Sequence, residues 1–349
     1  MITPEGKAWC ALAEAKGIGP KTLWSIADYL TSQQKTASWL LQQPDAMEIT
    51  LNGRSTRIDT SGMTISEPQE IECLEENEVS VLHPLHPDFP QRVRDLKDKF
   101  PLPAVLYTRG NTAIFNKPGV AIIGARHAGE LALNTADKLA SELVSHQVNI
   151  TSGYAKGIDI AAHFAALREG GTTIIVLSEG INQFRPKGEL GEFFTQEKIL
   201  VISQFEPDAH WATHFAMTRN KLVCALSRAV IVIVSGPERD VDGRLSGTFD
   251  AGVTALEMGI PVFVVAPSYF DDKPEGNSQL ITKGCTEWNP LDGAAPIITA
   301  ILSENASESK NFIDKTEKPK TKQLELFDNE DSPNNRIHIT LTRGRAKQR

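Results

Sequence analysis

The sequence predicts an α/β fold built on a doubly wound, mostly parallel sheet. Two observations lead to this prediction. Short runs rich in Val and Ile recur through residues 118–266, and helical patterns separate most of them. The runs are continuously apolar rather than alternating, which is typical of strands that are covered on both faces.

The expected strands follow one another at similar intervals after residue 118. Each is a buried-type run of four to seven residues, and 128–146 has the pattern of a helix. The runs lie at 119–125, 148–151, 172–177, 199–203, 229–234 and 261–266. Together with a lead-in segment that contains a predicted helix at 68–78, they define a core domain over residues 67–303.

Residues 1–66 are predicted to form an N-terminal helical module and its connection to the core. Apolar side chains recur at helical spacing before residue 46, and GIGPKT at 17–22 interrupts them. Pro20 suits a first helical turn, and the glycines allow a tight reversal before it. Residues 46–66 are rich in Thr, Ser, Gly and Arg, and we expect a connection with a short hairpin there.

Residues 304–349 are polar and are predicted to form a disordered tail. Inside it stands one apolar island, Gln323-Leu324-Glu325-Leu326-Phe327. In a disordered chain such an island is accidental, folds back onto the body, or anchors a partner by filling a pocket. Its string closely resembles the bacterial sliding-clamp-binding pentapeptide, Gln-Leu-x-Leu-Phe, in which Gln323, Leu324, Leu326 and Phe327 would make the contacts.

Composition narrows the functional classes. The net charge of −8 argues against a protein that coats nucleic acid indiscriminately, so a polyanion would need a local basic site. No run approaches the ~20 apolar residues of a membrane span, and the first residues lack a signal-peptide pattern. The four cysteines lie far apart, which fits a reducing cytoplasm and indicates no metal site. We expect no cofactor.

Four segments place glycines or basic residues after predicted strands or at helix starts. In a doubly wound sheet such positions meet at one edge, where ligands bind. Glycines let backbone N–H groups approach an anion, and a helix N-terminus favours negative charge. Each glycine taken alone is also ordinary turn chemistry. The segments are Gly124-Ala125-Arg126, Ser152 to Gly157, Thr218 to Lys221, and Ser246-Gly247-Thr248.

A nicotinamide dinucleotide does not fit this edge. The first turn reads GARHAG rather than G-x-G-x-x-G, and the second strand ends in Thr151-Ser152 without an acidic residue for the ribose.

Several stretches resemble the DprA/Smf family of DNA-processing proteins over roughly residues 1–290. They are VAIIGAR (120–126), TSGYAKGIDIAAH (151–163), GGTTIIVLSEGI (170–181), FAMTRNKLVCALSRAVIVI (215–233) and RLSGTFDAGVTALEMGIPVFVV (244–265). PLPAVLYTRGN (101–111) looks like the lead-in to the family's core, and GIGPKTLWSIADYL (17–30) looks like its SAM-like or helix-hairpin-helix-like module.

The resemblance implies a Rossmann-like core that binds single-stranded DNA through its phosphates without catalysis. It also implies a homodimer that helps to load the recombinase RecA during the uptake of transforming DNA in natural competence. Carried over residue by residue, the phosphate pocket consists of Gly124, Arg126, Ser152, Gly153, Lys156, Gly157, Arg219, Asn220, Lys221, Gly247 and Thr248. Tyr154 or Phe215 would stack on a base, or else belong to the core.

This sequence departs from the family pattern at four places. Ala125 stands where the family usually has Ser, and Lys156 stands where it has Arg, which keeps the charge but loses the bidentate fork. SGTFDAG replaces a more usual Ser-Gly-Ser-x-x-Thr-Ala. Residues 291–349 are too polar for the winged-helix-like domain in which many members end.

Other functions stay open. LOG-type phosphoribohydrolases resemble this core and carry G-G-x-G-T-x-x-E, but Ala251 occupies the glutamate position here and Asp250 is one residue out of register. His210 and His214 are spaced for one helix face, yet no third metal ligand lies near them in the sequence. His163 is expected to pack or cap, and Asp159 to stabilise its helix start or loop. A pure interaction adaptor is the third class.

Overall fold

The computed structural model describes residues 1–15, 17–43, 47–51, 54–59, 68–193, 195, 197–302 and 337–340. Its centre is a nine-stranded sheet of order β11-β10-β9-β5-β6-β7-β8-β4-β3. The seven strands from β11 to β8 are parallel, and β4 and β3 are antiparallel additions at one edge. The prediction of a doubly wound, mostly parallel α/β sheet is confirmed.

The predicted strands are present with small shifts at their ends. They are β5 (Gly119–Ile123), β6 (Asn149–Ser152), β7 (Thr173–Val176), β8 (Ile199–Ser203), β9 (Ala229–Val232) and β10 (Val262–Val265). Three strands without a sequence prediction complete the sheet: β3 (Ser80–Leu82), β4 (Leu106–Gly110) and β11 (Thr286–Trp288).

Helices cover both faces of the sheet, as the continuous apolar strands require. Along β5 the side chains alternate between two hydrophobic cores: Val120 and Ile122 belong to one, and Ala121 and Ile123 to the other. The Val120 core also contains side chains from α6 (Glu130–Ser145), α7 (Ile158–Arg168) and the helical residues 295–302. The Ala121 core contains side chains from α8 (Thr213–Ala225), α9 (Gly247–Glu257) and α10 (Glu275–Thr282).

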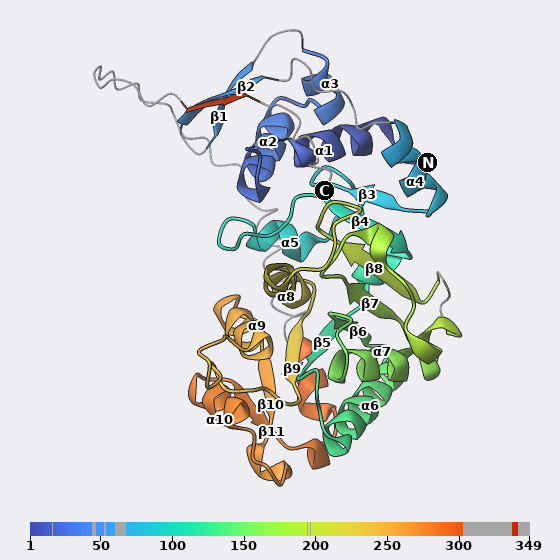
Figure 1. Cartoon of the computed structure of the whole chain (residues 1–349), viewed down its shortest axis with the longest axis vertical. Coiled ribbons are helices and arrows are strands. Elements are labelled where there is room, and N and C mark those ends of the chain that lie inside the picture. Colours follow the sequence, from blue (N-terminus) through green and yellow to red (C-terminus); the bar gives the residue numbers. More distant parts are fainter. Residues whose placement is uncertain are drawn as a thin grey trace, which may run out of the picture.

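The N-terminal region contains three helices, α1 (Pro4–Glu14), α2 (Pro20–Ser32) and α3 (Ala37–Leu41). The predicted turn in GIGPKT lies between α1 and α2, and Gly17 there has a φ of +89°. Figure 1 shows α1 and α2 at one end of the molecule, beside β3 and β4, with α10 and β11 at the opposite end.

These helices share a core with the sheet rather than standing apart from it. Trp9 and Leu30 belong to the same hydrophobic core as Leu106 of β4. The indole nitrogen of Trp24 donates a hydrogen bond of 3.0 Å to the carbonyl of Leu102. The lead-in segment adds α4 (Pro68–Glu76) and α5 (Gln91–Leu96), and α4 matches the helix predicted at 68–78.

A small second sheet follows the N-terminal helices. β1 (Met47–Leu51) pairs antiparallel with β2 (Arg54–Asp59), which confirms the hairpin expected within 46–66. β12 (Ile337–Thr340) pairs parallel with β2. These four residues of the predicted tail therefore form a strand, in which Ile337 and Ile339 alternate with polar residues as a strand pattern requires. The other tail residues, including Gln323, Leu324, Leu326 and Phe327, lie outside the described residues.

Among the described residues, no helix is both long enough and apolar enough to cross a bilayer.

Candidate functional site

Strand order places a topological switch point at β5. The chain runs from β5 through β6 and β7 to β8 on one side, and then returns to β9 on the other side of β5. Adjacent loops therefore diverge at the carboxyl ends of β5 and β9, which opens a crevice there in doubly wound folds. Two cavities of about 360 and 340 Å³ occupy this edge of the sheet.

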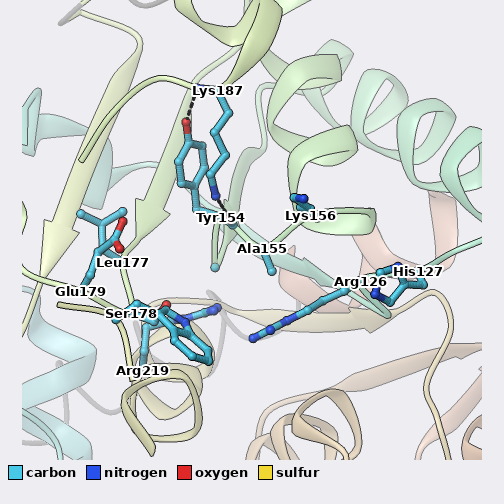
Figure 2. A pocket seen from close by; sticks show the side chains of 12 residues that line it. Arg126, His127, Tyr154, Ala155, Lys156, Leu177, Ser178, Glu179, Lys187 and Arg219 are labelled. Carbon is cyan, nitrogen blue, oxygen red and sulfur yellow. Dashed lines mark hydrogen bonds between the residues drawn. The ribbon is translucent and has the colours of Figure 1, made fainter. Parts of the chain in front are cut away.

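The two cavities meet along a common wall of three residues, Arg126, Ala155 and Arg219. The first cavity, drawn in Figure 2, extends toward the carboxyl end of β7. The second extends toward the N-terminus of α9.

The structure brings eight of the eleven predicted phosphate-site residues to these cavities. All four predicted segments contribute, so their convergence at one edge of the sheet is present in the fold. The eight are Gly124, Arg126, Gly153, Lys156, Arg219, Asn220, Gly247 and Thr248. The expected helix start at residues 218–221 is wrong, because α8 begins at Thr213 and these residues lie inside it.

The remaining three predicted residues line neither cavity. Ser152 is fully buried, and its hydroxyl donates a hydrogen bond of 2.6 Å to the carbonyl of Ile122. Gly157 has a φ of +83°, and a Cβ there would lie only 2.6 Å from the carbonyl oxygen of Ala125. These two residues shape the loops around the site. Lys221 instead lies near Asp250, where its charge opposes the rise that burial causes in the pKa of that carboxyl.

Arg219 is the central buried charge of the site. Only 4% of the residue is exposed, and its Nη1 lies 3.9 Å from Oδ2 of Asp159. Among the described residues, its Nε has no hydrogen-bond partner. Burial lowers the pKa of Arg219, the charge of Asp159 opposes that change, and the charge of Arg126 adds to it. Arg126 itself is exposed.

Two guanidinium groups therefore face one cavity. Figure 2 shows Arg126 and Arg219 reaching into it from opposite sides. Like charges held this close repel each other, and an anion between them removes the repulsion and supplies acceptors for their N–H groups.

Gly153 has a specific steric role beside Arg219. A Cβ built at this position would overlap the Arg219 guanidinium. The glycine is thus required by the close approach of a buried side chain.

The loop from Gly153 to Gly157 differs in one respect from the prediction. We expected its backbone N–H groups to face an anion, but those of Gly153 and Ala155 each donate a 3.2 Å hydrogen bond to Asp159 Oδ2. The carboxylate thus takes the place that a ligand anion would have had at these two groups. Burial raises the pKa of Asp159, and Arg219 and the two N–H groups oppose that rise. The prediction that Asp159 stabilises the loop is confirmed.

Tyr154 belongs to the core rather than to a stacking platform. It is only 5% exposed, and its hydroxyl donates to the carbonyl of Arg185 and accepts from the backbone N–H of Lys187. Lys187 Nζ in turn donates to the carbonyl of Tyr154 at 2.8 Å and lies 4.2 Å from the centre of its ring (Figure 2). Phe215 is half-buried and stacks on Phe205, with ring centres 4.1 Å apart.

His163 packs inside the fold, as expected. It is fully buried, and its Nδ1 lies 2.6 Å from the hydroxyl of Thr173. Burial lowers its pKa to about 3, and the charges of Arg219 and Lys187 contribute to the shift. His163 is therefore a neutral core residue at physiological pH.

Sequence reasoning missed six residues that line the first cavity: His127, Leu177, Ser178, Glu179, Lys187 and Trp211. Trp211 is 47% exposed, and the Arg126 guanidinium carbon lies 5.7 Å from the centre of its ring. The spacing of His210 and His214 suggested a helix through Trp211, but α8 begins at Thr213 and leaves Trp211 in the preceding loop. A tryptophan in so polar a loop was the available signal.

The described residues provide neither the ligands for a metal ion nor the glutamate of the hydrolase motif. His214 packs against the ring of Phe215, and no group of three potential metal-ligating side chains occurs among the described residues. Ala251, at the position of the hydrolase glutamate, lines the second cavity, whereas Asp250 lines neither cavity.

Comparison with known families identifies the architecture. The family model of DNA recombination-mediator protein A matches residues 80–295, which is more than half of the chain. This chain belongs to that family. The match includes all four segments of the switch-point site.

Curated relatives in this family carry the names DNA processing protein DprA and protein Smf. The chain is 32% identical over 192 residues to DprA of Streptococcus pneumoniae, which covers 54% of this chain and 65% of that protein. It is 27% identical over 292 residues to Smf of Synechocystis, covering 81% and 70% of the two chains. The matches to the S. pneumoniae and Bacillus subtilis proteins span just under two thirds of those relatives, 65% each.

Solved structures in the family share the fold. The X-ray structure of S. pneumoniae DprA gives a TM-score of 0.63 at 22% identity, and the match covers 84% of this chain and 97% of that one. The structure of Helicobacter pylori DprA, described in terms of its single-stranded DNA binding mode, gives 0.52 at 27% identity. That match covers 65% of this chain and 97% of the other.

Proposed function

We propose that this protein binds single-stranded DNA through backbone phosphates at the switch-point site. The surroundings of the Arg219 side chain are the observation on which this proposal depends. Arg219 is a buried cation whose Nε has no partner among the described residues, and the guanidinium of Arg126 faces it across the cavity. A phosphate between the two groups provides charge-assisted hydrogen bonds to both.

A strand suits the site better than an isolated phosphate. The two cavities adjoin at Arg126 and Arg219, so a phosphate there has space on both sides for the flanking nucleotides. Lys156 adds an exposed cation, and the partly exposed indole of Trp211 offers a stacking surface. The related H. pylori structure, described by its single-stranded DNA binding mode, supports the same reading.

The test is a salt series with an unstructured oligothymidine. Arg126→Ala and Lys156→Ala change exposed residues, so we expect both variants to fold normally. Each should weaken binding, and the plot of log affinity against log salt should become shallower by about 0.7 per lost phosphate contact. Lys117→Ala is the matched control. This exposed lysine precedes the amino end of β5, whereas the site lies at the carboxyl ends of the strands. If Arg126→Ala and Lys156→Ala bind the oligothymidine as tightly as the control does, the switch-point site is not where the phosphates bind.

We propose binding without chemistry at this site. The hydrolase alternative needs a glutamate at one position of α9, and the residue that lines the second cavity at this position is Ala251. Incubation with nucleoside monophosphates should release no free base; release that depended on Asp250 would favour the hydrolase.

The wider roles proposed for this chain follow from its family and from its tail. We propose a cytoplasmic homodimer that delivers single-stranded DNA to a RecA-type recombinase. For residues 323–327 we propose an interaction with the bacterial sliding clamp, on the strength of their sequence alone. Light scattering of the purified chain tests the dimer, and recombinase loading on protein-coated DNA tests the transfer.

A further inference from the structure

The first cavity has a wall that the phosphate contacts do not explain. Beyond Arg126 and Arg219, it is lined at the carboxyl end of β7 by Leu177, Ser178 and Glu179. Trp211 lies on the same cavity and is 47% exposed. An apolar side chain, a partly free indole and polar groups together are the surroundings that a nucleobase requires.

Glu179 is the group of this wall with the most selective chemistry. Its carboxylate makes no hydrogen bond or ion pair within the described part of the chain, and its backbone carbonyl is held by the hydroxyl of Ser203 at 2.7 Å. The nearby cation Lys187 is engaged by the carbonyl and ring of Tyr154. An ionised carboxylate accepts hydrogen bonds and donates none.

We infer that the first cavity holds one base of the bound strand and that Glu179 makes guanine the preferred base there. This inference rests on the proposed function, because the phosphate at Arg126 and Arg219 delivers the base to the cavity. The adjoining cavities make that connection short, since Arg126 lines both and also lies 5.7 Å from the Trp211 ring.

The preference for guanine follows from the donor pattern of each base. Guanine presents two adjacent donors on its Watson–Crick edge, the N1–H and the N2 amino group, which match the two oxygens of a carboxylate. Adenine and cytosine each place an acceptor beside their amino donor, and thymine flanks its single N–H with two carbonyls. Those acceptors meet a carboxylate unfavourably, so only guanine forms the bidentate pair.

The experiment measures binding of the full chain to oligothymidines that carry a single central dG, dA or dC. Wild-type protein should bind the dG oligomer at least about fivefold more tightly than the others, the lower end of what one bidentate base contact provides. Glu179→Gln replaces one acceptor oxygen by a donor amide, so the dG, dA and dC oligomers should bind this variant with equal affinity. Glu287→Gln, on the exposed face of edge strand β11, is the matched control for loss of one negative charge and should keep the preference.

Two results would overturn the inference. The first is equal binding of the dG, dA and dC oligomers by wild-type protein, and the second is a guanine preference that survives in Glu179→Gln. If Arg126→Ala still weakens binding in either case, the phosphate site stands and only the base assignment fails. If no oligomer binds, the proposed function and this inference fail together.

Discussion

The guanidinium of Arg219 and the carboxylate of Asp159 lie 3.9 Å apart, and both residues are almost fully buried. The pair joins α8 to the start of α7, and Asp159 also holds the backbone N–H groups of Gly153 and Ala155. One carboxylate therefore compensates the buried cation and shapes the loop beside it. Its role is structural, while Arg219 itself lines both cavities.

Asp159→Asn should reveal the cost of leaving Arg219 uncompensated. Removal of one partner from a buried ion pair typically destabilises a protein by about 3 kcal/mol or more. We expect a loss of about that size in urea unfolding at pH 7. Asp137→Asn breaks the more exposed pair with Arg168 and should cost less than about 1 kcal/mol. Equal losses in the two variants would contradict the importance assigned to the buried pair.

Gly153→Ala should displace the Arg219 guanidinium, because the added methyl group occupies its position. We expect affinity for single-stranded DNA to fall about tenfold, equivalent to about 1.4 kcal/mol. Gly19→Ala is the control: no atom lies within 4 Å of a Cβ at that position, which is remote from both cavities. Unchanged affinity in Gly153→Ala would show that the position of Arg219 does not matter for binding.

His163 should make stability depend on pH. Its pKa is about 3 in the folded protein and near 6.5 in the unfolded chain, so the unfolded state binds the extra proton between these values. Stability must therefore decrease as pH falls below 6.5, by about 2 kcal/mol from pH 7 to pH 5 for this residue.

His163→Leu removes that contribution, and Thr173 keeps its hydrogen bond to the carbonyl of Ile150. The difference in unfolding free energy between pH 7 and pH 5 should shrink by about 2 kcal/mol in this variant. His146→Asn, at the exposed end of α6, is the control for the removal of a histidine side chain. Parallel pH profiles for the wild type and His163→Leu would argue against a neutral buried imidazole.

The tail motif predicts direct binding to a sliding clamp. A synthetic 318–332 peptide titrated against the purified host clamp should bind at micromolar concentration, with Leu326 and Phe327 as apolar anchors. The same peptide with both anchors changed to Ala is the control. The clamp leaves the list of proposed partners if neither peptide binds at high micromolar concentration, or if both bind equally.

Much of the sheet was predictable from the sequence, because burial on both faces leaves a local signal. The run GVAIIGA at 119–125 contains β5, and AVIVIV at 229–234 contains β9, since a strand covered twice must be apolar at successive positions. The edge strands β3 and β11 escaped prediction. With three residues each, they are too short to show a period, and only pairing with a neighbour defines them.

The sequence by itself determined the fold class and the four segments that meet at the switch point, because apolar strand runs and turn glycines are local features of the sequence. Tertiary structure alone decided which groups face the two cavities. It placed the Ser152 hydroxyl in the sheet, directed Asp159 to the loop N–H groups, and brought Trp211 to the cavity. These outcomes depend on contacts between residues remote in sequence, such as Arg219 against Gly153, and packing in three dimensions fixes them.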